Sequence, residues 1–104
     1  MNRLVARKGN MVMFWCPGCN ALHSVDSTIH QVTGGGSALT VSPSILEQGG
    51  SRGIVCHSFL NRGVWQFLPD STHASAGQNV PMRGIPDEWR AGIHGAVFDA
   101  EGGE

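Results

Sequence analysis

The chain has 104 residues, of which only 14% are charged, with seven Lys and Arg against eight Asp and Glu. A single domain of this length buries a thin core and gains stability from a staple such as a metal ion. The net charge of −1 argues against a duplex nucleic-acid binder, which would show a clustered basic face. No apolar run reaches the roughly 18 residues that a membrane span requires.

The first half of the chain reads as short strands broken by turns. Met11 to Trp15 is an apolar, strand-favouring run that ends at the Pro17-Gly18 turn. Leu22 to Val32 has apolar spacing that fits one helix face, but it is rich in weak helix formers. We therefore predict two short strands that bend near Asp26-Ser27, with a helix as the open alternative.

Three further segments precede the centre of the chain. Ala38 to Val41 is predicted to be a strand. Ser42-Pro43-Ser44 is predicted to start a turn of helix, because Pro suits the first helical position. Gln48 to Gly53 is expected to form a loop.

A β-hairpin is the clearest predicted element. Its strands, Gly53 to Leu60 and Val64 to Leu68, flank a three-residue loop with Gly at its end, which is typical of a type I turn with a Gly bulge. In that register Leu60 faces Val64 and His57 faces Phe67. Both faces of the hairpin are largely apolar, so we expect it to be buried on both sides.

The last third is predicted to be looser. Asp70 can cap a short helical turn that Gly77 closes, and Pro86 can open a second short helix with Trp89 as its core anchor. We expect solvated charged ends and a flexible tail over residues 95–104. The sequence thus predicts one small β-rich α+β domain over 1–104, with a core of about 11–92, short antiparallel strands, a central hairpin and a metal staple.

The metal prediction rests on Cys16-Pro17-Gly18-Cys19. Two thiolates on a tight turn form the usual half-site for tetrahedral zinc. For the other half we select Cys56 and His73, which gives a structural Zn²⁺ site with the ligands Cys16, Cys19, Cys56 and His73. His23 follows Cys19 closely and is the alternative to His73. His57, between aromatic residues on the hairpin, is predicted to be a core residue.

The same motif allows a redox interpretation. An aromatic residue, Trp15, before Cys-Pro-Gly-Cys is typical of thioredoxin-like proteins, in which the first Cys is activated at a helix N-terminus. Gly34 to Gly36 interrupts the chain where a βαβ unit would continue, and this interpretation leaves Cys56 and His73 without a role. Three cysteines give no closed disulfide framework and favour a reducing cytosol.

The order of these motifs resembles a family of short, mostly uncharacterised proteins of tailed phages and prophages. The resemblance covers roughly Met13 to Trp89. Its motifs in this chain are Phe14-Trp15-Cys16-Pro17-Gly18-Cys19 with His23, Ser42-Pro43-Ser44, Val55-Cys56-His57-Ser58-Phe59-Leu60, and Asp70-Ser71-Thr72-His73-Ala74-Ser75-Ala76-Gly77.

The resemblance implies a phage origin, action in the host bacterial cytoplasm or in a virion, and a metal-bound Cys/His cluster, but no established activity or catalytic residues. We accordingly predict a zinc-binding protein that acts by protein–protein interaction, as a minor virion or assembly component or as an inhibitor of a host defence protein. The alternatives are a metal-dependent hydrolase, with Asp70, His57 or His23 as its base, and the thiol redox protein. Its protein partner and its oligomeric state stay undefined.

Overall fold

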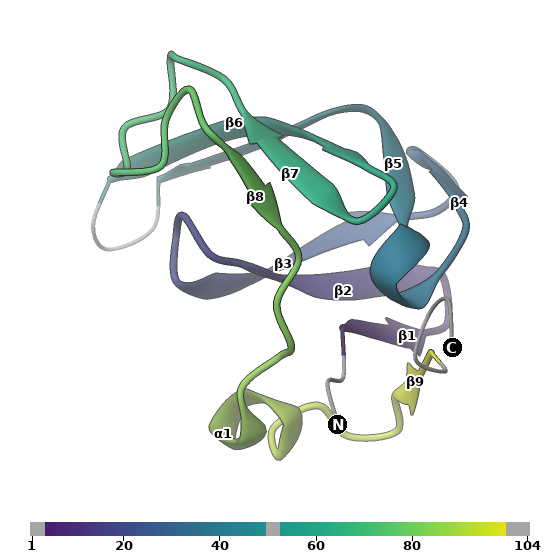
Figure 1. Cartoon of the computed structure of the whole chain (residues 1–104). Coiled ribbons are helices and arrows are strands. Elements are labelled where there is room, and N and C mark those ends of the chain that lie inside the picture. The colour runs from purple at the N-terminus through teal and green to yellow at the C-terminus, as the bar shows by residue number, and fades with distance from the viewer. Residues whose placement is uncertain (1–3, 50–52, 100–104) are drawn as a thin grey trace.

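Two antiparallel β-sheets face each other in the computed structural model, which describes residues 4–49 and 53–99 (Figure 1). The first sheet has the order β3-β2-β1-β9 and the second has the order β4-β5-β6-β7-β8. The strands are β1 Val5–Lys8, β2 Met11–Cys16, β3 Ala21–Asp26, β4 Gln31–Thr33, β5 Thr40–Gly49, β6 Ile54–Asn61, β7 Val64–Phe67, β8 Asn79–Pro81 and β9 Val97–Phe98. The helices are the 3-10 turn η1 Gly36–Ala38 and α1 Asp87–Arg90.

The hydrophobic core lies between the two sheets. Phe14 of β2 meets Trp65 of β7 with ring centroids 5.5 Å apart, and Trp65 stacks on Phe67. All three rings are fully buried. The predicted β-rich fold of antiparallel strands with a hairpin is therefore confirmed. In the described part of the chain, no helix has the length and apolar character needed to cross a membrane.

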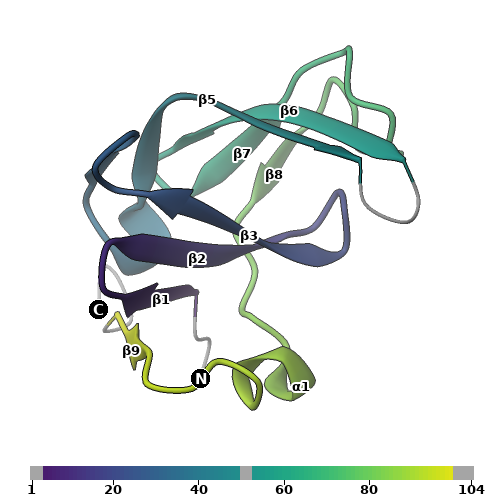
Figure 2. The ribbon, with the colours of Figure 1, turned by 180° about the vertical axis from the view of Figure 1, so that it is seen from behind.

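The outer face of the first sheet is covered by the segment that follows β8 (Figure 2). Trp15 and Ile85 are buried together there, and the edge of Trp89 packs on Trp15 with ring centroids 5.3 Å apart. The predicted helix after Pro86 does form as α1. Trp89 is 43% exposed, however, so it covers Trp15 and is not the core anchor that the sequence predicts.

The strand–bend–strand prediction near Asp26 is confirmed, since β3 ends at Asp26 and β4 begins at Gln31. The Asp26 carboxylate accepts hydrogen bonds from the backbone N–H and the hydroxyl of Thr28, at 2.8 and 2.6 Å. Such a side-chain turn competes with helix formation, which explains why the helical spacing of this segment does not yield a helix.

The segment around Pro43 forms no helical turn, so that prediction is wrong. It belongs to β5, whose pairing with β6 shifts between Val41, opposite Leu60, and Ile45, opposite Ser58. Three residues of β5 thus oppose one residue of β6, which is a β-bulge. Pro43 has no N–H to donate and is accommodated at such an irregularity. The predicted loop from Gln48 is also wrong at its start, because β5 runs to Gly49, and residues 50–52 lie outside the described residues.

The hairpin forms with a register one residue away from the prediction. Asn61 pairs with Val64 and Ser58 with Phe67, so the connecting loop has two residues, Arg62 and Gly63. Both have positive φ, 50° and 77°, as a type I′ turn requires. A side chain at Gly63 would also collide with the backbone carbonyl of Ser37.

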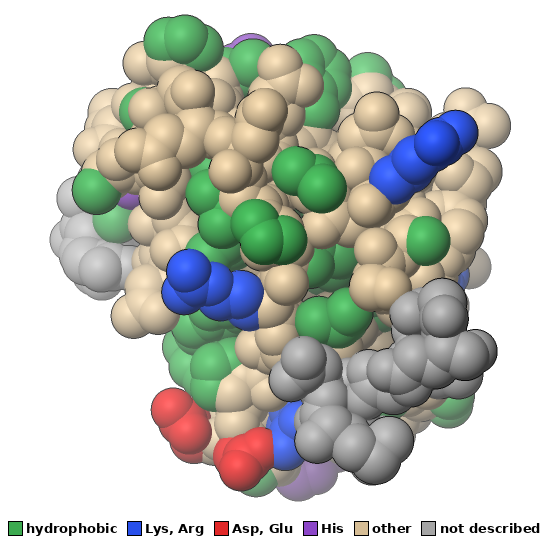
Figure 3. Space-filling model, in the orientation of Figure 1, with side chains coloured by type: hydrophobic (Ala, Val, Ile, Leu, Met, Phe, Trp, Pro, Cys, Tyr) green, Lys and Arg blue, Asp and Glu red, His purple; other side chains and the backbone are tan. Residues whose placement is uncertain are grey.

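The hairpin is buried on one face only, contrary to the prediction. The inward face carries Cys56, Ser58, Leu60, Trp65 and Phe67, all of which are buried. The outward face carries His57, Phe59, Val64 and Gln66, which are exposed or half-buried. In the view of Figure 3, hydrophobic and polar side chains are mixed and the Lys and Arg side chains stand apart from one another.

Two predictions for the last third are corrected. Residues 74–77 form a turn after a bend at His73, with no helix, and Asp70 does not cap one. Val97–Phe98 pairs with β1, and the Arg7 guanidinium forms an ion pair with Asp99 at 2.7 Å. This part of the predicted solvated tail therefore belongs to the first sheet, while residues 100–104 lie outside the described residues.

Asp99→Asn is expected to destabilise the protein at neutral pH. Burial alone would raise the pKa of Asp99, but hydrogen bonds from Arg7 and from the Gly36 N–H outweigh it and lower the pKa below 3.8. The carboxylate thus stabilises the fold above the pKa of the unfolded chain, and this contribution is lost as the pH falls through the folded-state pKa.

Urea unfolding at pH 7 and pH 3 measures this contribution. We expect a loss of about 1 kcal/mol for the variant at pH 7, since the pair is partly exposed, and a smaller difference from wild type at pH 3. An equal loss at both pH values would contradict the ion-pair explanation.

Candidate active site and metal centre

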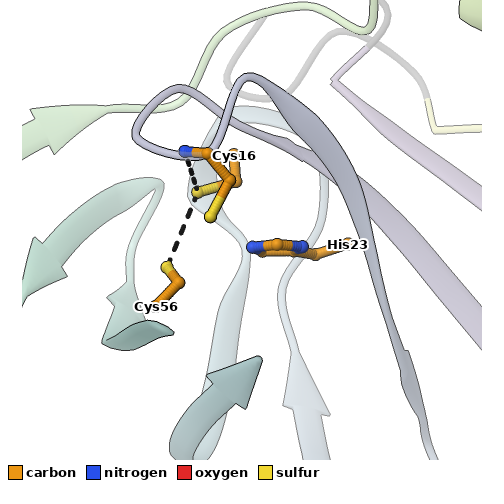
Figure 4. A group of neighbouring side chains, drawn as sticks. Cys16, His23 and Cys56 are labelled. Atoms are coloured by element: carbon orange, nitrogen blue, oxygen red, sulfur yellow. Dashed lines mark hydrogen bonds between the residues drawn. The ribbon is translucent and has the colours of Figure 1, made fainter. Parts of the chain in front are cut away.

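Three cysteines and one histidine meet between the two sheets. Figure 4 shows three of them, Cys16, His23 and Cys56. Cys16 ends β2, Cys19 lies in the following turn, His23 is in β3 and Cys56 is in β6. Phe14 and Cys16 point inward together, since side chains two apart share a face of a strand. The ligand atoms of the four residues all lie within 4.8 Å of one another, and all four residues are buried.

The spacing of these donors suits a tetrahedral metal. Cys16 Sγ and Cys56 Sγ are 3.8 Å apart. Two thiolates on a tetrahedral metal, with metal–sulfur bonds of about 2.3 Å, also lie about 3.8 Å apart. His23 Nε2 is buried and has no hydrogen-bond partner among the described residues, a state that a bound metal would satisfy. The cluster is therefore consistent with a metal site.

The structure brings together three of the four predicted ligands. Cys16, Cys19 and Cys56 belong to the cluster, and its histidine is His23, which the sequence left as the alternative. His73 lies beside the cluster without belonging to this group of four, with its Nε2 3.3 Å from Cys56 Sγ. The four-ligand set predicted from the sequence stays a prediction, with His23 the better-placed histidine.

The thiols of the cluster ionise unequally. Hydrogen bonding from Cys56 and from the Cys19 N–H, together with the electrostatic attraction of the nearby His23, lowers the pKa of Cys16 to about 4. Burial and the charge on Cys16 raise the pKa of Cys19 to about 11. The hydrogen bond to Cys16, together with burial, raises the pKa of Cys56. Cys16 is thus the thiol of the cluster that ionises most readily. A cation that binds all three sulfurs displaces the protons that remain on them.

A second group of polar side chains lies on the opposite, outward face of β6. His57 Nδ1 is 3.0 Å from Asp70 Oδ2, and His57 Nε2 is 3.3 Å from Ser44 Oγ. Ser44, His57 and Asp70 therefore form a continuous hydrogen-bonded chain, which we call the triad. A hydroxyl, an imidazole and a carboxylate in this order are the parts of a nucleophilic serine site.

Each member of the triad owes its position to a local feature. Ser44 lies at the β5 bulge, and its backbone carbonyl is 3.3 Å from His30 Nε2. His57 points outward because its neighbour Cys56 points inward. Asp70 lies in the turn after β7, where Ser71 Oγ accepts a hydrogen bond from the His57 N–H at 2.9 Å.

The sequence contains all three residues in its motifs but does not reveal that they meet. The sequence predicts a helical turn at Ser44 and a helix cap at Asp70, and the structure forms neither. The prediction of His57 as a core residue is wrong, since its side chain is 28% exposed and bonded on both sides. The sequence does contain one indication of a serine site, since Ser44, His57 and Asp70 each lie in a separate motif of the chain.

Comparison with known proteins places this chain in a family. The family model described as bacterial ubiquitination-like system serine protease (BubE) matches residues 2–68. This range contains Ser44, His57 and the four cluster residues, and it ends before Asp70. No curated protein and no solved structure matches the chain.

The match corrects the function predicted from the sequence. A phage protein that acts by protein–protein interaction, as a virion component or as an inhibitor, conflicts with a family of serine proteases from a bacterial system. The alternative of a metal-dependent hydrolase fits no better, since the family is described as a serine protease family. A phage origin receives no support from the match.

We expect the purified protein to hold one metal ion per chain, as measured by native mass spectrometry after purification without chelator. Loss of a hydrogen bond to a metal ligand typically lowers metal affinity by ~10–100-fold. His23→Ala should lower it by more than this, because the substitution removes one of the four groups that can bind the metal directly. His94→Ala, at an exposed position, is the matched control and should retain the metal. Full occupancy in a Cys16→Ser variant would contradict a metal site at this cluster.

Proposed function

We propose that this chain, which belongs to the family of bacterial ubiquitination-like system serine proteases (BubE), cleaves an amide bond of a protein substrate with Ser44 as its nucleophile. His57 is the general base and Asp70 orients it. The observation that carries this proposal is the unbroken chain of contacts from Asp70 through His57 to Ser44.

Acylation follows from the direction of these contacts. His57 Nδ1–H donates to the Asp70 carboxylate, which leaves Nε2 unprotonated and facing Ser44 Oγ. Nε2 accepts the hydroxyl proton as Oγ attacks the substrate carbonyl carbon. The carbon–nitrogen bond then breaks, and His57 gives its proton to the leaving amine. The Oγ–Nε2 distance of 3.3 Å is within the looser range of ligand-free sites.

Deacylation uses the same residues. A water molecule loses a proton to His57 Nε2 and attacks the ester carbon, and the proton passes to Ser44 Oγ as the ester bond breaks. The product carboxylic acid leaves and the triad is restored. Asp70 keeps its negative charge throughout and stabilises the imidazolium that forms in each half-reaction.

We expect the substrate to meet the triad on the outward face of the second sheet, where neighbouring apolar side chains are exposed. Leu46, which pairs with His57 across β5 and β6, is 52% exposed, and Phe59 is 39% exposed. Apolar side chains beside a catalytic group favour contact with a polypeptide chain. This surface supports a protein substrate as the partner of the domain.

The metal centre has a structural role in this proposal. Three thiolates and one imidazole form the ligand set typical of zinc, and four protein ligands leave no position for water. The cluster lies on the inner face of β6, whereas the triad lies on the outer face. Zinc therefore supports the fold behind the active site and takes no part in the reaction.

Ser44→Ala is expected to abolish labelling by a fluorophosphonate probe, which phosphonylates activated serines. Peptide mapping of the labelled wild-type protein should place the adduct on Ser44. Ser42→Ala is the matched control, since Ser42 lies two residues away on the same strand and is exposed. An adduct on another serine would overturn the assignment.

His57→Ala and Asp70→Asn test the other two roles. His57→Ala should lower the labelling rate by ~10³-fold or more, because the base is lost, and Asp70→Asn should lower it by up to ~10⁴-fold, because the tautomer of His57 reverses. Circular dichroism confirms that the variants are folded. Wild-type labelling rates in a folded His57→Ala variant would contradict a triad.

A further inference from the structure

We infer that His73 is a positioning residue that connects the metal centre to the triad, by a hydrogen bond from its Nε2–H to Cys56 Sγ. Its loop carries Asp70, so this bond holds Asp70 against His57. The inference deepens the proposed function and rests on it for the role of Asp70. The His73–Cys56 bond itself does not depend on that function.

The proton on His73 can be assigned from its other nitrogen. The Ser75 N–H donates to His73 Nδ1 at 3.2 Å, so Nδ1 carries no proton. In a neutral imidazole the proton is then on Nε2. Nε2 lies 3.3 Å from Cys56 Sγ and therefore donates to the sulfur. A nitrogen that carries a proton is not a metal ligand, so His73 supports a ligand and does not replace one.

The ring of His73 is held on two further sides. It meets Phe67 edge-on, with ring centroids 4.7 Å apart. It also lies against Gly18, where an added Cβ would overlap the ring. Gly18 does not have the positive φ that favours glycine, so the ring of His73 is the reason that this position of the Cys16–Cys19 turn has no side chain.

Two residues of the loop after β7, Asp70 and His73, contact two neighbouring residues of β6, His57 and Cys56. Asp70 reaches His57 on the outer face, and His73 reaches Cys56 on the inner side. Between them the loop bonds to the β6 backbone, where Thr72 N–H donates to the Val55 carbonyl at 2.8 Å. The loop thus contacts both faces of β6. Its contact on the inner face is the hydrogen bond from His73 to Cys56, a residue of the metal centre.

Metal binding strengthens the inner contact. A metal-bound cysteine is a thiolate, and hydrogen bonds to charged acceptors are about twice as strong as those between neutral groups. Outer hydrogen bonds to metal ligands also raise metal affinity, typically by ~10–100-fold. Metal retention and the placement of Asp70 are therefore expected to change together when His73 is altered.

The first test compares His73→Ala with His73→Gln, which keeps an N–H donor near the position of Nε2. Two quantities are measured on the full chain: the rate of metal loss to a chelator and the rate of Ser44 labelling by fluorophosphonate. His73→Ala should lose metal ~10–100-fold faster and label ~10-fold or more slowly, whereas His73→Gln should stay within a few-fold of wild type.

The cobalt-loaded protein gives a spectroscopic readout of the bond itself. The thiolate-to-cobalt charge-transfer band should shift in His73→Ala and return towards its wild-type position in His73→Gln, with an unchanged tetrahedral ligand-field spectrum in both. A ligand-field spectrum that shows a lost nitrogen ligand in both variants would overturn the inference, because His73 would then ligate the metal.

Gly18→Ala tests the same contact without changing a polar group. The new methyl group should displace the His73 ring and produce the same defects as His73→Ala. In the double variant Gly18→Ala/His73→Ala the defects should not add, since the ring is already absent. Additive losses would contradict the role assigned to Gly18.

The outcomes separate this inference from the proposed function. If the wild-type protein shows no labelling of Ser44, the proposed function fails, while the cobalt band and the rate of metal loss still test the His73–Cys56 bond. If Ser44 is labelled at the wild-type rate in a folded His73→Ala variant that loses metal quickly, the link to Asp70 is overturned and the proposed function stands.

Discussion

The alternation of side chains along β6 is the constraint on which the rest of the structure depends. Cys56 points into the core and His57 points out, because neighbouring residues of a strand face opposite sides of a sheet. A shift of one residue in register would exchange the two and destroy both sites at once. The inward row that continues with Ser58 and Leu60 prevents that shift, because it is buried against the opposite sheet. The register of β6 that buries these core side chains is therefore also the one that places Cys56 in the metal cluster and His57 in the triad.

A metal bound at the Cys/His cluster would compensate for the thin core of a small domain. The core between the sheets is formed mainly by a few aromatic and aliphatic side chains around Trp65. Cys16 and His23 belong to the first sheet and Cys56 to the second, so a metal bound to all three ties the sheets together. A link between residues 40 positions apart in sequence reduces the conformational freedom of the unfolded chain as well. With a metal bound there, the inner face of β6 would have the rigidity that the proposed catalytic group on its outer face requires.

The sequence predicted the architecture better than it predicted the active site. The strand of Met11 to Trp15, the bend at Asp26, the hairpin and the short helix after Pro86 are local, and each follows from residues that are close in sequence. The meeting of Ser44, His57 and Asp70 is not local, since it depends on the β5 bulge and on the hairpin register. Both of these were predicted wrongly: Pro43 is as typical of a helix start as of a bulge, and the turn Arg62-Gly63 differs by one residue from the predicted loop. The sequence leaves open which histidine accompanies the cysteines, and in the structure His23 belongs to the cluster while His73 lies beside it.

Asp70 is the most exposed member of the triad, with 63% of its side chain accessible to solvent, whereas the His57 side chain is only 28% exposed. An exposed carboxylate interacts weakly with its partner through water, and it must be ordered at a cost in conformational entropy. Such a residue can orient a histidine only if its backbone is already fixed. Ser71 and Thr72 fix the loop to β6 through hydrogen bonds to His57 and Val55, and His73 fixes its inner side to Cys56. In the proposed mechanism, a serine site with an exposed carboxylate thereby gains from a metal bound at the cluster the order that burial would otherwise provide.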